Sequence, residues 1–523
     1  MPLRNVTDMP TSVMVLYYEK FTVRLSMRKT QMNLPVGRCA SPTTWTSWHS
    51  INWKKVARAV KSLQARIVKA VKAKHFHKVN ALLHLLTRSF YGKLLAILRV
   101  TTNKGSKTCG VDKVLWDTPL RKWKGIEQLN VKGYKAKPLK RKSIPKKNGK
   151  FRHLGIPTIR DRAMQALYKL ALEPIAETLA DPNSYGFRPK RSCADAIKQC
   201  HTVLSQRKSA QWVLEADIKG CFDNISHDWI LQHIPLSKKV LTQWLKAGYL
   251  DKKHWFPTES GTPQGGIISP TIANMVLDGL EEVINRYAHH KPNSNPFKIN
   301  FVRYADDFVV SCSNSEYLEQ EIKPLISKFL ADRGLALSAE KTMITHIRQG
   351  FDFLGFNIRK YRLKCLTKPR KDAVKSIYSS MNECANNHKA ATQKELIRMI
   401  TPKIKGWANF FRHSCAKQTF SRLDNKVFKL LWKWAKRRHP NKGSRWIKAK
   451  YFKSKGKRHW VFSVTDKKKT SELPLFDATK IIRHVKIKSL SNPYDKEWEG
   501  YFKERAKGKL AKHSAISKLA TAN

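Results

Sequence analysis

The chain has 523 residues, with 102 Lys and Arg against 38 Asp and Glu and a formal net charge of +64. This length exceeds one hydrophobic core, and about two to four domains are expected. A chain this basic repels itself unless a polyanion neutralises it. We therefore expect a nucleic acid as the partner, with binding that weakens steeply as salt rises.

Membrane and disulfide-rich classes are disfavoured. The longest apolar candidate, residues 81–98, contains His84, Arg88 and Lys93, so no run approaches a bilayer span. The nine cysteines include no Cys-x-x-Cys pair, which argues against a disulfide scaffold and a structural zinc site. The N-terminus lacks the layout of a secretory signal, so we expect a bacterial, cytoplasmic protein, and an organelle transit peptide ranks below that.

Regular structure is expected only after residues 1–47, to which no role is assigned. Apolar residues recur every three or four positions from Trp53 and again from Val79, which predicts two helices packed as a hairpin. Residues 132–152 then hold ten Lys or Arg and no acid. Within them, Ile144 to Lys150 predicts a hairpin whose basic tip contacts phosphate, the alternative being a solvated charged face.

The later segments are mostly helical. We expect helices over 161–179, 194–204 and 318–332, then a strand-like run at Phe351 to Ile358. Beyond residue 370 the pattern is helical. The last helix carries an apolar stripe of core type, made of Phe420, Leu423, Val427, Leu430 and Trp434.

A strongly basic stretch follows that helix. Residues 436–458 contain eleven Lys or Arg and no acid, with Trp446, Tyr451 and Phe452 interleaved. Cations alternating with aromatic faces suit a single strand or an RNA backbone better than they suit a solvated tail.

The most informative feature is a pair of carboxylates, Asp306 and Asp307, within the apolar run Phe301–Val310. Apolar residues on both sides predict two short strands, with the pair at or next to a hairpin turn. Buried carboxylates need a nearby cation, and Asp217 ends another strand-like run. If the two strands are neighbours, three carboxylates converge, which suits magnesium and two-metal phosphoryl transfer.

The motifs around these acids, taken together, resemble reverse transcriptases encoded by group II introns, the bacterial maturases. The similarity runs from about Trp48 to about Phe502. The matching pieces are Ile144-Pro145-Lys146, Arg152-His153-Leu154-Gly155-Ile156-Pro157, Ser184-Tyr185-Gly186-Phe187-Arg188-Pro189, Ala216-Asp217-Ile218, Pro263-Gln264-Gly265-Gly266, Tyr304-Ala305-Asp306-Asp307, Leu337-Ser338-Ala339-Glu340-Lys341-Thr342 and Phe353-Leu354-Gly355-Phe356. Gly406 to Phe410 and Arg437 to Lys442 resemble the maturase thumb and its DNA-binding extension.

The resemblance implies roles for the acids and their neighbours. Asp217 and Asp306 would bind two Mg²⁺ ions as catalytic ligands, with Asp307 beside them in the same metal site. Lys341 would neutralise these acids and take part in the nucleotide site. Phe222 would pack beneath the sugar of the incoming nucleotide and select dNTP over NTP.

The resemblance also implies how nucleotide and nucleic acid are held. Lys146 and Arg152 would clamp the triphosphate, and Gln264 would contact the nucleotide from the opposite side. The turn Phe353-Leu354-Gly355-Phe356 resembles a primer grip. The nucleic-acid-binding residues expected in the basic stretch are Arg437, Arg438, Lys442, Arg445, Trp446, Lys448 and Lys450.

The fold class implied is α+β, a right-hand polymerase with fingers, a palm with an antiparallel sheet and a helical thumb. The expected division is 48–113 for a helical N-terminal extension, 114–365 for fingers and palm, 366–440 for the thumb or maturase domain, and 441–523 for a basic DNA-binding segment. No Cys follows Cys415, and the last stretch holds only His484 and His513. We therefore expect no metal-binding endonuclease module.

The function implied is RNA-directed DNA synthesis combined with binding of the host intron RNA to promote splicing and intron mobility. The partners implied are that intron RNA, target DNA, an RNA template, a DNA primer and dNTP, with no membrane. The main alternative is a splicing cofactor that has lost synthesis, which the intact acids disfavour. A reverse transcriptase of another lineage ranks third, and an RNA-dependent RNA polymerase ranks last because Phe222 should reject ribose.

Overall fold

The computed structural model describes residues 47–145, 149, 151–252, 254–288, 295–456, 458–466 and 469–508. The chain divides into two compact units. The first unit is built from Met1–Ser192, Leu214–Ile344 and Ile487–Asn523, and the second from Cys193–Val213 and Thr345–Lys486. Each unit therefore combines segments that are far apart in the sequence.

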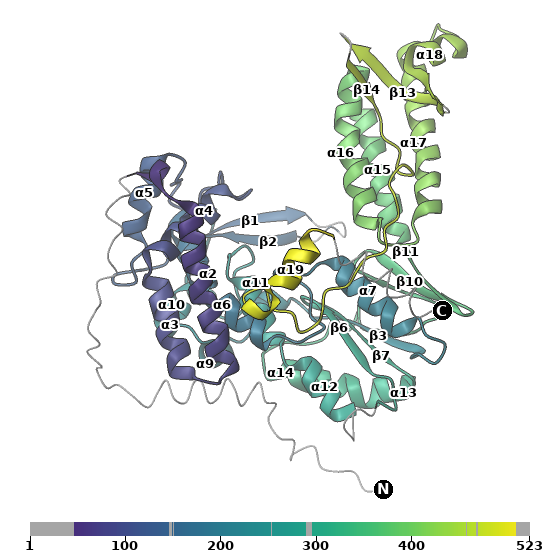
Figure 1. The fold of residues 1–523 in the computed structure, drawn as a ribbon. Helices are drawn as coiled ribbons and strands as arrows, with labels where there is room; N and C mark the ends of the chain where they lie inside the picture. Colours follow the sequence, from purple (N-terminus) through teal and green to yellow (C-terminus); the bar gives the residue numbers. More distant parts are fainter. Residues whose placement is uncertain are drawn as a thin grey trace. The chain divides into compact units, whose positions relative to one another are not determined.

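In the first unit, helices form the N-terminal part and also lie beside the sheets (Figure 1). They are η2 (Trp48–Ser50), α2 (Trp53–Lys72), α3 (Phe76–Arg88), α4 (Phe90–Thr102), α5 (Pro119–Gln128), α6 (Ile159–Leu179), α8 (Cys221–Asn224), α9 (His227–His233), α10 (Lys238–Leu245), α11 (Ser269–Leu277), α12 (Leu280–Ala288), α13 (Ser315–Tyr317), η3 (Leu318–Ile322), α14 (Lys323–Ala331), η4 (Lys496–Trp498) and α19 (Glu499–Ala506).

The predicted helical hairpin near the N-terminus is wrong in one respect, because its second arm is two helices, α3 and α4. The chain bends at Ser89, whose backbone is extended and whose hydroxyl accepts a hydrogen bond from the Gly92 N–H at 3.4 Å. A Cβ on Gly92 would lie 2.6 Å from the Leu86 carbonyl oxygen, so the bend depends on glycine there. Apolar periodicity continues through the bend and hides it.

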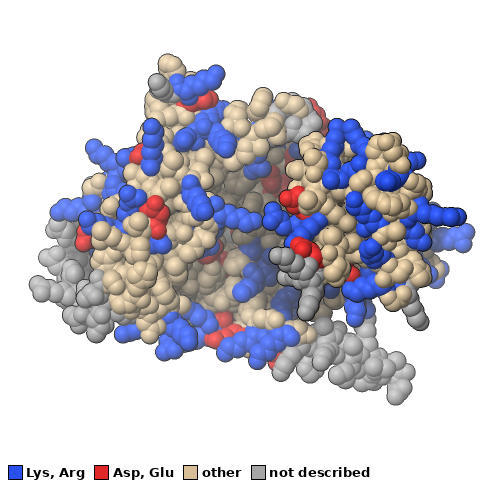
Figure 2. Space-filling view, turned by 90° about the horizontal axis from the view of Figure 1, so that it is seen from above, with Lys and Arg blue, Asp and Glu red and all other residues tan. Residues whose placement is uncertain are grey.

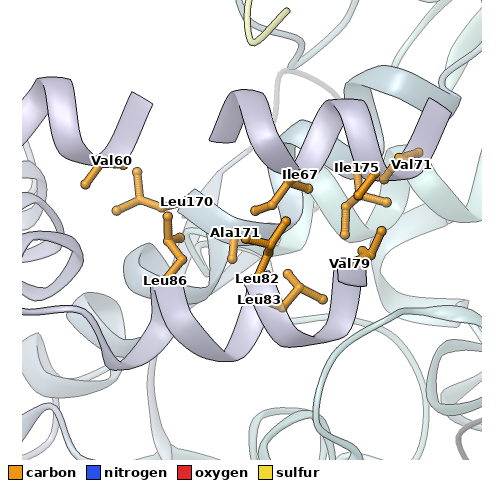
Figure 3. Close-up of a cluster of buried hydrophobic side chains, with 11 residues drawn as sticks. Val60, Ile67, Val71, Val79, Leu82, Leu83, Leu86, Leu170, Ala171 and Ile175 are labelled. Atoms are coloured by element: carbon orange, nitrogen blue, oxygen red, sulfur yellow. The ribbon is translucent and has the colours of Figure 1, made fainter. Parts of the chain in front are cut away.

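These helices pack on α6 through a buried apolar cluster. Figure 3 shows its side chains from α2, α3 and α6 pointing toward one another. The cluster consists of Val60, Ile67, Ala70, Val71, Val79, Leu82, Leu83, Leu86, Leu170, Ala171 and Ile175. A buried amide, Gln64 Nε2, donates to the Leu170 carbonyl at 2.8 Å and so meets its hydrogen-bonding need inside the core. The amphipathic stripes seen in the sequence thus form the core of the helical extension.

A first sheet of the first unit has the strand order β2-β1-β4-β5. Its strands are β1 (Leu139–Pro145), β2 (Phe151–Ile156), β4 (Tyr249–Asp251) and β5 (His254–Phe256). The antiparallel β1–β2 pair confirms the predicted hairpin, while β4 joins β1 in parallel. The residues 146–148 and 150 of the predicted basic tip lie outside the described residues.

A second sheet carries the predicted acids and has the order β6-β7-β3-β8. Its strands are β3 (Trp212–Asp217), β6 (Asn300–Tyr304), β7 (Asp307–Cys312) and β8 (Met343–His346). Strands β3 and β7 are neighbours, which is the arrangement that the proposed convergence of carboxylates requires.

The second unit combines a three-helix group with two small antiparallel sheets. Helices α15, α16 and α17 run side by side in Figure 1. The elements are α7 (Cys193–Leu204), β9 (Phe351–Phe353), β10 (Phe356–Tyr361), β11 (Lys364–Pro369), α15 (Lys371–Asn387), α16 (Gln393–Phe411), α17 (Lys417–Arg438), α18 (Ser444–Tyr451), β12 (Phe452–Lys455), β13 (Arg458–Asp466) and β14 (Lys469–Glu472). The apolar stripe predicted for the last thumb helix is buried on α17.

The last described stretch, from Ile487 onward, belongs to the first unit and packs on its helices. Tyr494 Oη donates to Glu173 Oε2 of α6 at 2.6 Å, and Lys72 Nζ of α2 lies 2.5 Å from Asp495 Oδ2. Acids of this stretch thus neutralise lysines of the N-terminal helices. The sequence offered no sign of this return, and the expected domain boundaries stay predictions.

Among the described residues, no single helix is long and apolar enough to cross a membrane. Helices α3 and α4 pass that test of length and composition only as a pair, bent by 63°.

The helical core gives a direct test. Leu86 is fully buried, whereas the neighbouring Leu85 is 44% exposed. Leu86→Ala should lower the free energy of unfolding by about 2–5 kcal/mol, because it leaves a cavity among the packed helices. Leu85→Ala, the matched control, should change it by about 0.5 kcal/mol or less. Urea unfolding monitored by circular dichroism measures both, and equal losses would contradict the assigned packing.

Candidate active site

The predicted acid pair lies at a tight hairpin turn. Strands β6 and β7 pair with Tyr304 opposite Asp307, so Ala305 and Asp306 form a two-residue turn. Ala305 has a φ of 60°, a left-handed conformation that usually favours glycine. The hairpin is therefore confirmed, and its turn is held in a strained backbone conformation.

A neighbouring segment braces this turn through its backbone. The Tyr185 N–H donates to the Arg303 carbonyl at 2.9 Å, and the Arg303 N–H donates to the Asn183 carbonyl at 3.0 Å. A Cβ on Gly186 would lie 2.4 Å from the backbone nitrogen of Ala305. Only glycine allows this approach, which gives the Ser-Tyr-Gly-Phe motif a structural role beside the turn.

A buried ionic group supports the turn from below. Arg303 is 0% exposed, and its guanidinium hydrogen-bonds to Asp278 Oδ1 and lies 3.8 Å from Asp181. It also donates to the carbonyl of Ala305, in the turn itself, and to Asn274 Oδ1, both at 3.4 Å. Burial raises the pKa of the Asp278 and Asp181 carboxyls, and the Arg303 charge opposes that shift.

The three predicted carboxylates lie on adjacent elements and interact electrostatically. Asp217 ends β3 beside β7, and Lys341 Nζ donates to its Oδ2 at 2.6 Å. Burial first, and then the negative charges of Asp217 and Asp306, raise the pKa of Asp307 to about 6. Burial and Asp217 also raise the pKa of Asp306, while Lys341 and Arg152 lower it. The three acids repel one another and depend on nearby positive charge.

These residues fit a magnesium site of the open kind. Among the described residues, no group of three or more His, Cys, Asp or Glu side chains is close enough to form a metal cage. Magnesium, however, is commonly held by one or two carboxylates with water and substrate phosphates. The raised pKa values of Asp306 and Asp307 mark a place where a divalent cation would relieve repulsion.

Four of the predicted nucleotide-binding residues lie in the first unit: Arg152, Phe222, Gln264 and Lys341. Arg152 of β2 donates from Nε to Gln264 Oε1 at 2.9 Å. Phe222, in α8, is half-buried and meets Phe187 edge to face, with ring centroids 6.2 Å apart. Lys146, the fifth, lies outside the described residues. Arg152 and Gln264 thus act as a hydrogen-bonded pair, which the sequence did not predict.

The predicted primer-grip turn lies in the second unit and joins β9 to β10. Leu354 and Gly355 both have positive φ, 51° and 84°, as a two-residue hairpin turn requires. Phe353 and Phe356 are buried, and Phe356 stacks on Phe410 of α16. These two rings therefore serve the core, and only the turn itself is partly exposed.

The predicted basic residues lie at the end of α17, in the turn that follows it and on α18. Most are exposed, and Lys442 and Lys450 lie 5.7 and 4.7 Å from the ring centroid of Trp446. Arg438 instead donates to the Lys389 carbonyl at 3.0 Å and helps to hold the helices together. Figure 2 shows Lys and Arg over much of the face it presents, with few acids.

The interleaved aromatic residues of this stretch divide into two groups. Trp446 is 38% exposed, whereas Tyr451 and Phe452 are each 4% exposed. Tyr451 and Phe452 therefore pack inside the second unit. The expectation that all three would offer faces to a nucleic acid is wrong for these two.

Three family models match the chain. The reverse transcriptase (RNA-dependent DNA polymerase) model matches residues 144–358, and the model for the N-terminal domain of reverse transcriptase matches residues 48–129. The model for the group II intron, maturase-specific domain matches residues 374–452. The three matches follow one another along the chain in the order that the motifs predicted.

Several curated proteins are similar. Group II intron-encoded protein LtrA of Lactococcus lactis is 31% identical over 350 residues, 55% of this chain and 58% of LtrA. Protein YkfC of Escherichia coli is 31% identical over 327 residues, 54% of this chain and 84% of YkfC. The putative COX1/OXI3 intron 2 protein of Saccharomyces cerevisiae is 26% identical over 322 residues, 51% of this chain and 37% of that protein.

The chain belongs to the group II intron-encoded reverse transcriptase/maturase family. The resemblance drawn from the motifs is thereby confirmed, as is the α+β polymerase fold class. The chain spans 58% of the length of LtrA. A solved structure of telomerase from Candida albicans matches 58% of this chain and 58% of its own chain, at 14% identity and a TM-score of 0.35.

Within this reverse transcriptase family member, the Arg303 group is the part that motif reading missed. A signal existed, because Arg303 stands within the run Phe301-Val302-Arg303-Tyr304, whose other residues are apolar or aromatic. A charge in a buried strand needs a buried partner. Its partners, Asp278 and Asp181, were not identifiable from spacing alone.

Removing Arg303 should destabilise the protein strongly. Arg303→Leu leaves Asp278 and Asp181 buried without their cation, which should lower the free energy of unfolding by about 3–5 kcal/mol. The double variant Arg303→Leu/Asp278→Leu should recover part of this loss. As a control, Arg286→Leu breaks an exposed ion pair with Glu282 and should cost about 1 kcal/mol or less. Equal losses in the Arg303 and Arg286 variants, measured by urea unfolding, would contradict the buried pairing.

The acids should make stability pH-dependent when divalent ions are removed. Asp307 binds its proton more tightly in the folded chain, with a pKa of about 6 against 3.8 ordinarily. Stability should therefore fall as pH rises through the interval between these two values. Asp307→Asn should flatten this part of the profile, and magnesium should do the same in the unaltered protein. Thermal unfolding in EDTA tests this, with the exposed Asp228→Asn as control; a D307N profile parallel to that of the unaltered protein would refute it.

Proposed function

We propose that the protein is an RNA-directed DNA polymerase that extends a DNA primer with dNTP along an RNA template. One observation carries the proposal: Asp217 ends a strand directly beside the hairpin that bears Asp306 and Asp307. Arg152 and Gln264 lie in the same unit, where the incoming nucleotide would be held.

The chain's own residues would divide the work as follows. Two magnesium ions, when bound, supply charge stabilisation and lower the pKa of the primer 3′-hydroxyl. Asp217 and Asp306 would hold them, with Asp307 beside them. Lys341 balances the charge of Asp217 before they bind.

The nucleotide would be held by groups around these acids. Arg152 and Lys146 would bind the triphosphate, and Gln264 would contact the nucleotide. Phe222 would lie under the sugar and exclude a 2′-hydroxyl. Positioning and charge stabilisation are the main demands of phosphoryl transfer, and these residues meet both.

We further propose that the protein binds its host group II intron RNA, promotes splicing, and supports intron mobility into target DNA as a ribonucleoprotein in the bacterial cytoplasm. The match to the maturase-specific domain and the exposed cations of the second unit support this role. A splicing cofactor without synthesis remains the second candidate, and the clustered acids favour the polymerase over it.

Asp306→Ala separates the two activities. Loss of this carboxylate should reduce dNTP incorporation on a primed RNA template by about 10³-fold or more, because metal-ion charge stabilisation is worth several kcal/mol. Intron splicing should stay near normal, since RNA binding needs only the basic surface. EDTA should abolish incorporation by the unaltered protein.

The exposed carboxylate variant Asp228→Ala is the matched control and should leave both activities unchanged. Incorporation that persists in Asp306→Ala would contradict the assigned polymerase site. Loss of splicing in a folded Asp306→Ala protein would contradict the separation of roles.

A further inference from the structure

A fourth carboxylate, Asp223, lies beside the residues proposed to bind the nucleotide and has no role in the function proposed so far. Asp223 follows Phe222 in α8 and is exposed. The Gln264 side-chain Nε2 donates to both of its oxygens, Oδ1 and Oδ2, each at 3.0 Å. At its other end, Gln264 Oε1 accepts from Arg152 Nε at 2.9 Å. The three side chains form one continuous row.

The backbone on both sides of this row is fixed. The Thr262 N–H donates to the Phe222 carbonyl at 2.6 Å, and the Gly155 N–H donates to the Gln264 carbonyl at 2.8 Å. Gly261, with a φ of 82°, lies so close to α8 that a Cβ would meet the Phe222 carbonyl oxygen at 2.5 Å. The loop that carries Gln264 is thus anchored to α8 at one end and to β2 at the other.

Chemistry then permits only one orientation of the Gln264 amide. A carboxylate only accepts hydrogen bonds and a guanidinium only donates them. A flipped amide would place its oxygen against Asp223 and its NH₂ against Arg152, so that both contacts would be lost. Asp223 therefore determines which way Gln264 faces.

The same row sets the orientation of Arg152. Its Nε is engaged by Gln264, while its two Nη groups make no hydrogen bond with any described residue. A guanidinium held by Nε presents its Nη pair as a fork, the geometry that binds phosphate oxygens best. Arg152 is thus aligned before any nucleotide arrives.

We infer that Asp223 is a positioning residue for the incoming nucleotide, which holds Gln264 and, through it, Arg152 in their binding orientation. The inference rests on the proposed polymerase function and extends it. Asp223 touches neither the nucleotide nor the reacting atoms in this role. Its contribution is preorganisation, which strengthens ground-state binding by reducing the ordering that binding requires.

This role predicts an effect on nucleotide affinity alone. Asp223→Ala should raise the KM for dNTP by about ten-fold, in line with the loss of a charged hydrogen bond, and should change kcat by about two-fold or less. Asp223→Asn keeps one acceptor oxygen for Gln264 and should show a smaller rise. The affinity for primer–template should be unchanged, as it should be for the exposed control Asp228→Ala.

The partner is tested by a double-variant cycle with Gln264→Ala. If Asp223 acts through Gln264, adding Asp223→Ala to Gln264→Ala should raise KM by less than about two-fold further. A full ten-fold effect in that background would overturn the inference. So would an unchanged or lowered KM in Asp223→Ala, which would mean that the carboxylate chiefly repels the triphosphate.

The same variants are compared by equilibrium dNTP binding to a complex with a dideoxy-terminated primer, which needs no catalysis. An unaltered protein that binds dNTP but does not extend the normal primer contradicts the proposed polymerase function. In that event the binding comparison still decides the role of Asp223. An unaltered protein that does not bind dNTP overturns both.

Discussion

The proposed catalytic site depends on one electrostatic constraint. Three carboxylates share a partly buried region and must be held there against their mutual repulsion. Asp217 and Asp307 lie on neighbouring strands and Asp306 lies in the adjoining turn, and burial with like charge raises the pKa of Asp306 and Asp307. The fold holds these carboxylates in place against their repulsion with a tight turn. Ala305 adopts a strained conformation in this turn, and the groups packed around the turn support it.

Those groups reach the turn from two directions. The backbone beside Gly186 closes against it from one side, and the Arg303 guanidinium holds the Ala305 carbonyl within a buried ionic group. A buried ion pair contributes little net stability, because desolvation offsets the attraction between its charges. Its value here is geometric. The Arg303 group holds the carbonyl of Ala305, the residue directly before Asp306.

The sequence motifs located the three acids, because a polymerase active site needs particular residue types in a particular order. Asp306 and Asp307 were found because they interrupt an apolar run, and Asp217 because it ends a strand-like run, while the hairpin followed from the apolar residues on both sides of the pair. The sequence did not reveal contacts between residues that are far apart along the chain. Nothing in the spacing linked Arg303 to Asp278, or Tyr494 to Glu173.

The bend at Ser89 was hidden because the apolar stripe continues through it. The burial of Tyr451 and Phe452 was hidden for a similar reason, since composition does not report which face a ring presents.

The two proposed activities place different physical demands on one chain, and this explains how they coexist. Polymerisation needs a few groups at fixed distances: the acids, Lys341, and the row from Asp223 to Arg152, all in the first unit. Binding a long RNA needs many cations and tolerates variation in their positions, because most of its free energy comes from counterion release. In the proposed function, exposed lysines and arginines of the second unit would meet that second demand without taking part in the first. A substitution at the acids therefore changes chemistry while leaving the basic surface intact, and neutralising one exposed lysine weakens binding only slightly. The two activities can use separate surfaces because polymerisation depends steeply on the distances between its groups, whereas RNA binding does not.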